Sequence, residues 1–564
     1  MTTNRTIGLF LLATTFLSSP AGAATLTPTL DTIKREAADL SGNFVLSELT
    51  SALPTGAVEV KIGDKSYYFM PSGENAALLA TLAGTPAGSL VASENGIFEL
   101  NGQKYGFDVA SIPDSVFEYA ENSVKDYNFI VKEADAEGNL TTKRYKINLK
   151  PENFSTSKSI TWTEVPEAQK DDKDDDLSDG KVSAVIAVRL PNDQTKYFQY
   201  TYTKPDGRII YSTRQVNFTG DVIDADFIGN FLSANYPAGG AIYNTGIRNK
   251  INGNFISNYL IGNGIQGGAI YNIGTIENIT GNFVGNYAAS TGNFAYGGAI
   301  YNDRATIGSI NANFADNYTS LGHSWGGGIA NSGIISSIAG NFISNHTTSN
   351  GGAIFNGSIF DGPDVAINNV YGDFINNYVA SSSSGDDVAS GGAIFNGSVF
   401  GGFSNVKIGN IIGDFIGNHV SSVIYSSYGG AIFNGTTKFD YTTSNGYASL
   451  GDITGNFIAN YAVSVNDSAY GGAISNYGYA QYSSLGNITG SFIKNYAVSD
   501  SKSAFGGAIY NGIKDKGSVA LGYVSGNFLN NYVQTKSITQ LAYGGAVYTE
   551  GNMTFAAGEQ KTYF

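Results

Sequence analysis

Two short motifs alternate through the second half of this chain, and their alternation restricts how it can fold more than any other feature. The first reads F-x-x-N and occurs ten times, from Phe227 to Phe528. The second reads G-G-A-I-Y-N with variations and also occurs ten times, from Gly239 to Gly544. Copies recur at intervals of about 25 to 42 residues. Such strict repetition indicates a solenoid, in which each repeat buries its apolar face against its neighbours.

Each repeat contains three short segments of strand character, with Gly and Asn at the expected corners. Three strands per repeat are the pattern of a parallel β-helix, and the usual chirality of parallel crossovers makes such a helix right-handed. We therefore predict an all-β fold: a right-handed parallel β-helix over residues 216–550, preceded by a β-rich N-terminal region. Its coils are expected to stack about 4.8 Å apart.

The region before the repeats predicts a different organisation. Residues 24–163 form short alternating segments joined by turn signals, such as Asn101-Gly102, and predict β-hairpins. Residues 164–181 carry eight Asp or Glu and predict an acidic linker or loop. A calcium loop is disfavoured because the sixth position counted from Asp172 is Leu177 and not Gly. Residues 182–215 predict a β-hairpin that leads into the solenoid.

The N-terminus has the features of a signal peptide over residues 1–23. Arg5 precedes the apolar run Ile7–Leu17, and Ala21-Gly22-Ala23 fits a cleavage site. We therefore expect export to the cell surface, the outer membrane or the extracellular space. The chain has no cysteine, so it has no disulfide framework, and its net charge of −15 argues against a nucleic-acid partner.

Both motifs share the pattern I-x-N, and side chains two residues apart lie on the same face of a strand. We therefore expect Ile256 with Asn258, and Ile270 with Asn272, to point into the helix. Asn would then stack on Asn from coil to coil, where its amide can satisfy neighbouring backbone groups. The residues predicted to form these structural ladders are Asn230, Asn258, Asn286, Asn317, Asn345, Asn377, Asn418, Asn460, Asn495 and Asn531 in the first motif, and Asn244, Asn272, Asn302, Asn331, Asn356, Asn396, Asn434, Asn476 and Asn511 in the second.

The residue between Ile and Asn in the second motif is aromatic in eight of ten copies. If Ile and Asn point inward, these rings point outward, one per coil, and form a candidate ligand-binding stripe. The alternative is a structural ladder of rings that stack on one another under covering loops. The eight residues are Tyr243, Tyr271, Tyr301, Phe355, Phe395, Phe433, Tyr510 and Tyr548.

The sequence contains no constellation typical of catalysis, and we expect no catalytic residue, cofactor or metal. Polysaccharide-cleaving β-helix enzymes need clustered carboxylates. Asp226, Asp373 and Asp414 instead precede the motif Phe where other copies carry Asn, so they are interpreted as repeat variants. His346 and His419 take the place that Tyr fills after F-x-x-N in other copies.

The alternating motifs resemble the passenger regions of the polymorphic outer membrane proteins of chlamydiae, in which F-x-x-N and G-G-A-[ILV] recur. Examples here are Phe255-Ile-Ser-Asn258 and Gly267-Gly-Ala-Ile270. The resemblance covers residues 216–550. It implies the passenger of a type V autotransporter: a β-helix exported through the outer membrane, displayed on the surface and used in adhesion.

An autotransporter passenger is followed by an outer-membrane β-barrel of some hundreds of residues, but only 20 residues follow Gly544. We therefore expect a truncated passenger, with 551–564 as its truncated end and the barrel missing from this sequence. The leading functional hypothesis is a secreted, surface-displayed, non-enzymatic passenger that binds a host or neighbouring cell-surface protein or glycan. The alternatives are a secreted β-helix polysaccharide lyase or hydrolase, and a structural stalk.

Overall fold

The chain divides into two compact units, Met1–Lys150 and Pro151–Phe564. The computed structural model describes strands between residues 44 and 147, then Phe154 and residues 158–190, 195–212 and 220–555, with gaps at 359–361, 382–387, 400–403, 438–446, 480–481, 515–516 and 538. The predicted signal peptide, residues 1–23, lies outside the described residues, as does 556–564 of the predicted end.

The first unit contains two sheets in its described part. The two strands that flank the predicted turn Asn101-Gly102 pair antiparallel, and the turn residues themselves lie outside the described residues. The larger sheet has the order β1-β3-β2-β4-β5-β6 and the smaller one the order β7-β8-β9. The strands are β1 (Phe44–Leu46), β2 (Val58–Ile62), β3 (Lys65–Phe69), β4 (Val91–Ala92), β5 (Ile97–Leu100), β6 (Gln103–Gly106), β7 (Tyr119–Glu121), β8 (Tyr127–Ala134) and β9 (Leu140–Ile147).

The second unit begins with a four-stranded antiparallel sheet of order β10-β13-β12-β11. Its strands are β10 (Ile160–Val165), β11 (Lys173–Asp174), β12 (Lys181–Arg189) and β13 (Thr195–Thr203). The acidic segment 164–181, predicted as a linker or a loop, lies within this sheet between β10 and β12, so the loop is the alternative that applies. It folds back through the short 3-10 turns η4 (Glu167–Gln169) and η5 (Leu177–Asp179), and the Asp176 carboxylate caps the second turn by accepting from the Ser178 amide. The unit boundary lies before β10, and not at the predicted 163/164, because β10 pairs with β13.

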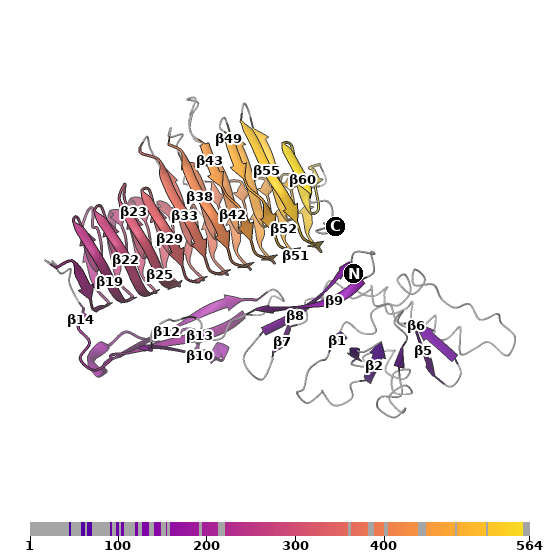
Figure 1. Cartoon of the computed structure of the whole chain (residues 1–564), viewed down its shortest axis with the longest axis horizontal. Coiled ribbons are helices and arrows are strands. Elements are labelled where there is room, and N and C mark those ends of the chain that lie inside the picture. The colour runs from indigo at the N-terminus through magenta and orange to yellow at the C-terminus, as the bar shows by residue number, and fades with distance from the viewer. Residues whose placement is uncertain are drawn as a thin grey trace. The chain divides into compact units, whose positions relative to one another are not determined.

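The rest of the second unit is a parallel β-helix, as predicted, and its coils are seen side by side in Figure 1. The second coil illustrates the pattern, with β19 (Ile247–Ile256), β20 (Tyr259–Gln266) and β21 (Ile270–Asn272). Equivalent motif residues pair between coils, for example Phe255 with Phe283 of β22 (Thr275–Val284). The last described strand, β60 (Asn552–Phe555), pairs in parallel with β55 (Ser518–Ser525) and so continues the coil pattern.

Three long parallel sheets result, each built from one segment of the coil. The first sheet passes through β19, the second through β20 and the third through β21. In the first coil they contain β16 (Asp226–Ile228), β17 (Phe231–Ser233) and β18 (Ile242–Asn244), and in the tenth coil they contain β56 (Phe528–Leu529), β57 (Tyr532–Thr535) and β59 (Val547–Thr549). The first sheet begins one step earlier, at β14 (Ile210–Tyr211) and β15 (Val222–Asp224).

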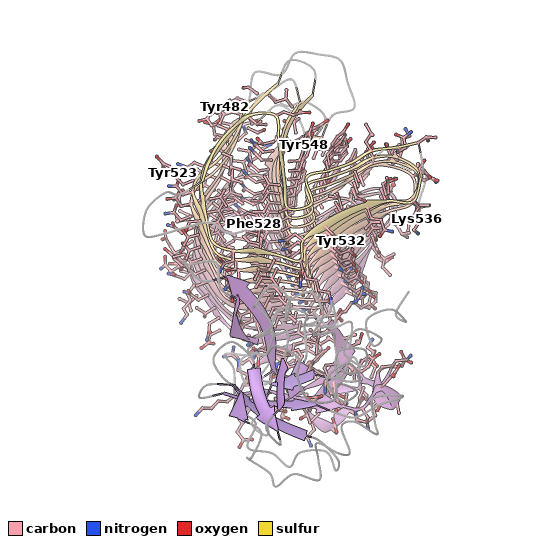
Figure 2. All side chains as sticks on the ribbon, turned by 90° about the vertical axis from the view of Figure 1, so that its right-hand side faces the viewer. Tyr482, Tyr523, Phe528, Tyr532, Lys536 and Tyr548 are labelled. Atoms are coloured by element: carbon pink, nitrogen blue, oxygen red, sulfur yellow. The ribbon has the colours of Figure 1, made fainter. Side chains whose placement is uncertain are left out.

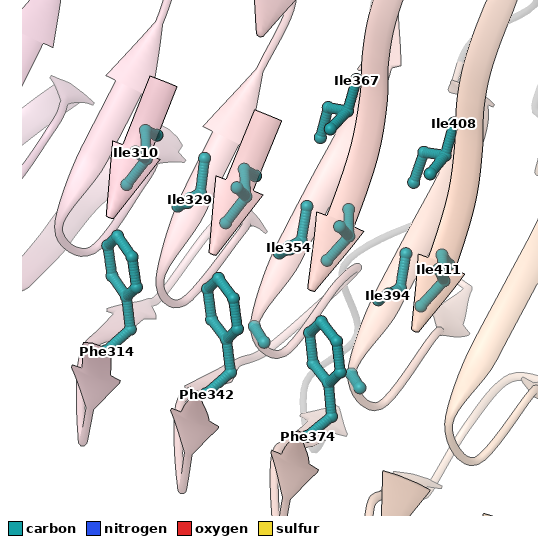
Figure 3. Packing of buried hydrophobic residues seen from close by; sticks show 14 of the residues in the cluster. Ile310, Phe314, Ile329, Phe342, Ile354, Ile367, Phe374, Ile394, Ile408 and Ile411 are labelled. Carbon is teal, nitrogen blue, oxygen red and sulfur yellow. The ribbon is translucent and has the colours of Figure 1, made fainter. Parts of the chain in front are cut away.

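The interior of the β-helix is filled by stacked Phe and Ile side chains. Figure 3 shows Phe314, Phe342 and Phe374 in successive coils, facing isoleucines of the other strands. Their rings lie 4.8 and 4.9 Å apart and are nearly parallel. Each interior side chain stacks on the equivalent side chain of the next coil. A single coil therefore cannot exclude water from its interior without its neighbours.

The predicted position of Ile256 was wrong, although that of Ile270 was right. The interior cluster takes Phe255 and Ile270. Side chains alternate along β19, so Ile256 lies on the outer face next to Phe255. Ser257 then adopts a left-handed φ of 52°, which turns the chain and brings Asn258 back inside. The simple two-residue alternation therefore holds in G-G-A-I-Y-N but fails at the corner in F-x-x-N.

The outer face that carries Ile256 is buried as well. Its equivalents in the first nine coils, such as Ile343 and Ile416, are at most 4% exposed, whereas Leu529 in the tenth coil is half-buried. Part of this face lies against the four-stranded sheet: the Tyr200 hydroxyl of β13 is 3.4 Å from the Ser257 hydroxyl, and Ser344 donates to the Ala187 carbonyl of β12. The N-terminal sheet of the second unit thus serves as a cover for the flank of the β-helix.

Candidate functional site

Both asparagine ladders predicted from the sequence are present. In the first ladder, each side-chain Nδ2 donates to the Oδ1 of the equivalent residue in the next coil, from Asn230 to Asn531, at 2.8–3.0 Å. The second ladder runs in the same way from Asn244 to Asn511 at 2.8 Å, and Asn511 then donates to Thr549.

These amides also satisfy the backbone at the corners. Asn258 donates to the Phe227 carbonyl at 2.9 Å, and its own backbone amide donates to Asn286 Oδ1 at 3.0 Å. A buried amide with all its partners is stabilising, whereas one that loses a partner costs about 1–3 kcal/mol. The asparagines therefore hold the coils in register, and they are not available to a ligand.

The aromatic residues proposed as a candidate ligand-binding stripe are mostly buried, which favours the alternative of a structural ladder of stacked rings. We call them the inner aromatic row. Of its eight members, Tyr271, Tyr301, Phe355, Phe395, Phe433 and Tyr510 are 0–7% exposed, and only Tyr243 at one end is largely exposed, at 45%. The rings do point away from the coil interior and do stack, for example Phe395 on Phe433 at 5.1 Å, but they form part of a second apolar cluster.

A concave corner explains why the inner row is covered. The first glycine of G-G-A-I has a left-handed φ, 61° at Gly297, and the chain turns so tightly that the residues on either side face each other. Tyr296 before the glycines lies 4.7 Å from Tyr301 after them. The same position before the glycines holds Trp325, Tyr428, Tyr470 and Phe505 in later coils. Aromatic residues are thus frequent five positions before the residues of the inner row, and this pattern in the sequence could have indicated a second core.

A different row of rings remains partly exposed, and the sequence reasoning did not propose it as a site. It is formed by the residue that follows F-x-x-N, on the outer face of the second sheet. We call it the outer aromatic row. Its members are Phe231, Tyr259, Tyr287, Tyr318, His346, Tyr378, His419, Tyr461, Tyr496 and Tyr532. An aromatic residue at this position in all ten copies was the signal that pointed to it.

The rings of the outer row form one uninterrupted stack. Neighbouring centroids are 4.5–5.3 Å apart, with interplanar angles of 13° or less. The two end members are the most exposed, Phe231 at 47% and Tyr532 at 41%, and the intervening rings are half-buried; Tyr532 is visible near the last coil in Figure 2. Because each ring covers the face of the next, the row presents ring edges and polar tips, and not ring faces. The Tyr461 tip is occupied, since its hydroxyl accepts from Arg189 at 2.9 Å.

The outer row is uncharged at neutral pH. Burial raises the pKa of Tyr287 and of Tyr378 to about 12, so their hydroxyls stay protonated and can donate hydrogen bonds. Burial lowers the pKa of His346 and of His419 to about 4, so both imidazoles are neutral. The Nδ1 of each His lies near a corner carbonyl, 3.4 Å from Ser344 O and 3.3 Å from Gly417 O.

The carboxylates interpreted as repeat variants are part of a third ladder on the first sheet. Asp414 donates its backbone amide to Asp373 Oδ1 at 2.9 Å, and Asn456 donates to Asp414 Oδ1 at 2.7 Å. Asp226 ends this ladder in the first coil, where the Tyr202 hydroxyl donates to it and Arg208 forms an ion pair with it at 3.0 Å. These carboxylates occupy the place of asparagines, as the sequence indicated.

Within the described residues, no three His, Cys, Asp or Glu side chains gather as a metal site requires. The described part of the chain contains no helix long and apolar enough to span a membrane. Comparison with known proteins found no match for this chain among family models, curated proteins or solved structures.

Proposed function

We propose that this chain is a secreted, surface-displayed, non-enzymatic passenger, similar to those of autotransporters, that binds a protein or glycan on a host or neighbouring cell. The observation that carries the proposal is the outer aromatic row: ten partly exposed rings on one face, aligned over the length of the β-helix. The signal-peptide features of residues 1–23 and the alternating repeats support export and display.

The geometry of the row restricts the kind of ligand. Sugar rings commonly stack on aromatic faces, but here those faces are covered by neighbouring rings. The accessible groups are ring edges and a line of tyrosine hydroxyls that repeats at about 4.8 Å, the spacing of the coils. Such a surface suits an elongated partner that offers many hydrogen-bond acceptors and weak apolar contacts, since many small contributions add along the row.

The test is binding of the full chain to cultured host cells and to immobilised cell-surface proteins and glycans. A triple variant, Tyr287→Ser, Tyr318→Ser and Tyr378→Ser, removes three hydroxyl tips from the middle of the outer row. The matched control is the triple variant Tyr371→Ser, Tyr447→Ser and Tyr482→Ser, whose tyrosines are 43–47% exposed on strands of the first sheet. We expect at least a tenfold loss of affinity in the first variant and little change in the control.

The same materials separate the alternative functions. If both triple variants bind as tightly as the unmodified chain, the row is not the binding surface, and a structural stalk becomes the better description. Release of reducing or unsaturated ends from acidic or neutral polysaccharides incubated with the chain would contradict the non-enzymatic proposal and favour a polysaccharide lyase or hydrolase.

A further inference from the structure

The four-stranded sheet covers a row of corner residues on the β-helix. The row, here called the corner row, is formed by the third residue of each F-x-x-N motif. All ten members have left-handed φ angles between 52° and 66°. They are Gly229, Ser257, Gly285, Asp316, Ser344, Asn376, Gly417, Ala459, Lys494 and Asn530. Because a left-handed residue turns the chain sharply, the corner row projects towards whatever lies against it.

Contacts place the four-stranded sheet across the corner row from the second coil onward. The Tyr200 hydroxyl of β13 lies 3.4 Å from Ser257 in the second coil. The Ala187 carbonyl of β12 accepts from Ser344 at 2.9 Å and from Asn376 at 3.4 Å, in the fifth and sixth coils.

The sheet reaches still further along the β-helix. Arg189 of β12 donates to the Tyr461 hydroxyl of the outer aromatic row at 2.9 Å, beyond the corner of the seventh coil. Two residues of a strand, Ala187 to Arg189, span about 7 Å, which matches the height of one to two coils. Strand β12 therefore runs along the axis of the β-helix, so the sheet crosses the corner of every coil between its end contacts.

Asp316 is the member of the corner row in the fourth coil, between the contacts of Tyr200 and Ala187. The members that contact the sheet on either side of it are Ser or Asn, whereas Asp316 brings a carboxyl group to this interface. Among the described residues, none donates a hydrogen bond to that carboxyl. The Asp316 side chain is of intermediate exposure, so its carboxyl is partly removed from water. A carboxylate in such a place without a donor or a cation is destabilising, and protonation relieves the cost.

We propose that the four-stranded sheet is a pH-responsive clasp, which is held on the β-helix when the Asp316 carboxyl is protonated and loosens when that carboxyl ionises. Three titratable side chains lie close enough to Asp316 to interact with its charge. They are Tyr200 of the four-stranded sheet, and Tyr318 and Tyr378 of the second sheet of the β-helix. All three are uncharged near neutral pH, and His346, which stacks between the last two, is neutral there as well.

Two ion pairs lie within the four-stranded sheet. Lys196 of β13 pairs with Glu164 of β10 at 2.9 Å, and Asp175 pairs with Lys173. Arg189 lies at the far end of the interface, over the Tyr461 ring. Among the groups named here, we expect the carboxyl of Asp316 to change its charge near neutral pH.

The direction of the effect follows from linkage. Burial raises the pKa of Asp316 to about 7, from 3.8 in the absence of burial. The covered state then holds its proton more tightly than an uncovered state does, so the clasp is strongest below pH 4, weakens as the pH rises to about 7, and changes little above that. Acid thus closes the sheet onto the β-helix, and neutral pH favours its release.

Hydrogen exchange of the full chain tests the proposal. We expect amide protection in β12 and β13, corrected for intrinsic exchange rates, to fall about tenfold between pH 5 and pH 8. Trp162 provides a second readout because it is 7% exposed and packs 5.5 Å from Tyr200. The chain has two tryptophans, so Trp325→Phe leaves Trp162 as the reporter, and its acrylamide quenching should increase over the same pH range.

Asp316→Asn should abolish the pH dependence and keep the sheet protected at pH 8. Asn already occupies the same corner, with the same left-handed φ, at Asn376 and Asn530, so this variant is compatible with the fold. Asp316→Ser, which introduces the residue type found at Ser257 and Ser344, provides an independent repeat. The matched control is Asp303→Asn, which lies at the third-sheet corner of the same region and should behave like the unmodified chain. Protection that is independent of pH in the unmodified chain, or an equal pH dependence in Asp316→Asn, would overturn the proposal.

Discussion

The inner and outer aromatic rows are built from the same repeat, yet their surroundings differ. Rings of both rows stack between neighbouring coils at about the coil spacing, as Phe395 on Phe433 and Tyr461 on Tyr496 show. The outer row has a ring in all ten coils, whereas the inner row has one in eight. The inner row follows a glycine corner that closes onto the preceding strand, and six of its eight rings have lost their contact with water. In some coils the residue across the corner is a second ring, as Tyr296 is opposite Tyr301. The outer row follows an F-x-x-N corner, and its rings keep an exposed edge.

The difference shows that a regular spacing predicts stacking but not exposure. Any residue on the outer face of a parallel β-helix stacks on its copy in the next coil, because the register is the same in every coil. Whether water reaches that residue depends on what lies across the nearest corner. We therefore expect mutations in the inner row to reduce stability most, and mutations in the outer row to reduce binding.

Phe395→Ala should give the largest effect. The side chain is fully buried in the inner row between Phe355 and Phe433. Truncation of a buried Phe costs about 3–5 kcal/mol, since it removes apolar contacts and leaves a cavity. Urea unfolding followed by circular dichroism should show this loss, and local hydrogen exchange should place it in the coils around Phe395. A loss below about 1 kcal/mol would mean that the inner row is not a core.

Acidification should weaken the outer row and not the inner row. The pKa of His346 and of His419 is lowered to about 4, against 6.5 for an unperturbed His. Between these values the unfolded chain binds protons that the folded chain does not, so the free energy of unfolding falls as the pH drops from about 6.5 to 4. The exposed ring edges screen the effect, and we expect about 2 kcal/mol for the pair.

The double variant His346→Tyr and His419→Tyr provides the control, because it completes the row with the residue used in most other coils. Its free energy of unfolding should lose the part of the pH dependence that the histidines cause, whereas the opposite contribution of Asp316 should remain. If the double variant and the unmodified chain lose stability equally between pH 6.5 and 4, the histidines are not buried in the stack.

Much of the β-helix could be predicted from the sequence because its determinants are local and repeated. The Asn ladders and the interior Ile270 follow from strand alternation within one motif. The inward turn of Asn258 could not be predicted from alternation, since it depends on the left-handed φ of Ser257, and that position holds Ser, Gly, Asp, Ala, Lys or Asn in different copies. Coverage of the inner row and of the corner row depends on contacts between segments that periodicity does not encode.

Tyr378→Ala in the outer row should have an intermediate effect on stability. The ring stacks between His346 and His419 at 4.6 and 5.0 Å but is only half-buried. Loss of two stacking contacts and part of its apolar burial should cost about 1–2 kcal/mol. Tyr378→Phe serves as the control, since it keeps the stack and removes the hydroxyl. A cost for Tyr378→Ala that equals that of Phe395→Ala would remove the distinction between the two rows.

Tyr243→Ala should give the smallest effect, although Tyr243 occupies the same motif position as Phe395. Tyr243 stacks on one neighbour, Tyr271 at 5.2 Å, and remains 45% exposed. The residue that faces it across the glycine corner is Ala238, where later coils have Tyr296 or Trp325. Because the side chain of Tyr243 is largely exposed, there is little buried apolar area to lose, so we expect a change of about 0.5 kcal/mol in the free energy of unfolding.

The converse substitution tests the same cause in the opposite direction. Ala238→Tyr would place a ring across the corner from Tyr243, as Tyr296 lies across from Tyr301 at 4.7 Å. If cover across the corner decides the burial of the inner row, Tyr243 should become protected from solvent in Ala238→Tyr, and Tyr243→Ala in that background should cost about 1–2 kcal/mol. An unchanged small cost in both backgrounds would show that motif position or distance from the first coil, and not the facing residue, sets the contribution of each ring.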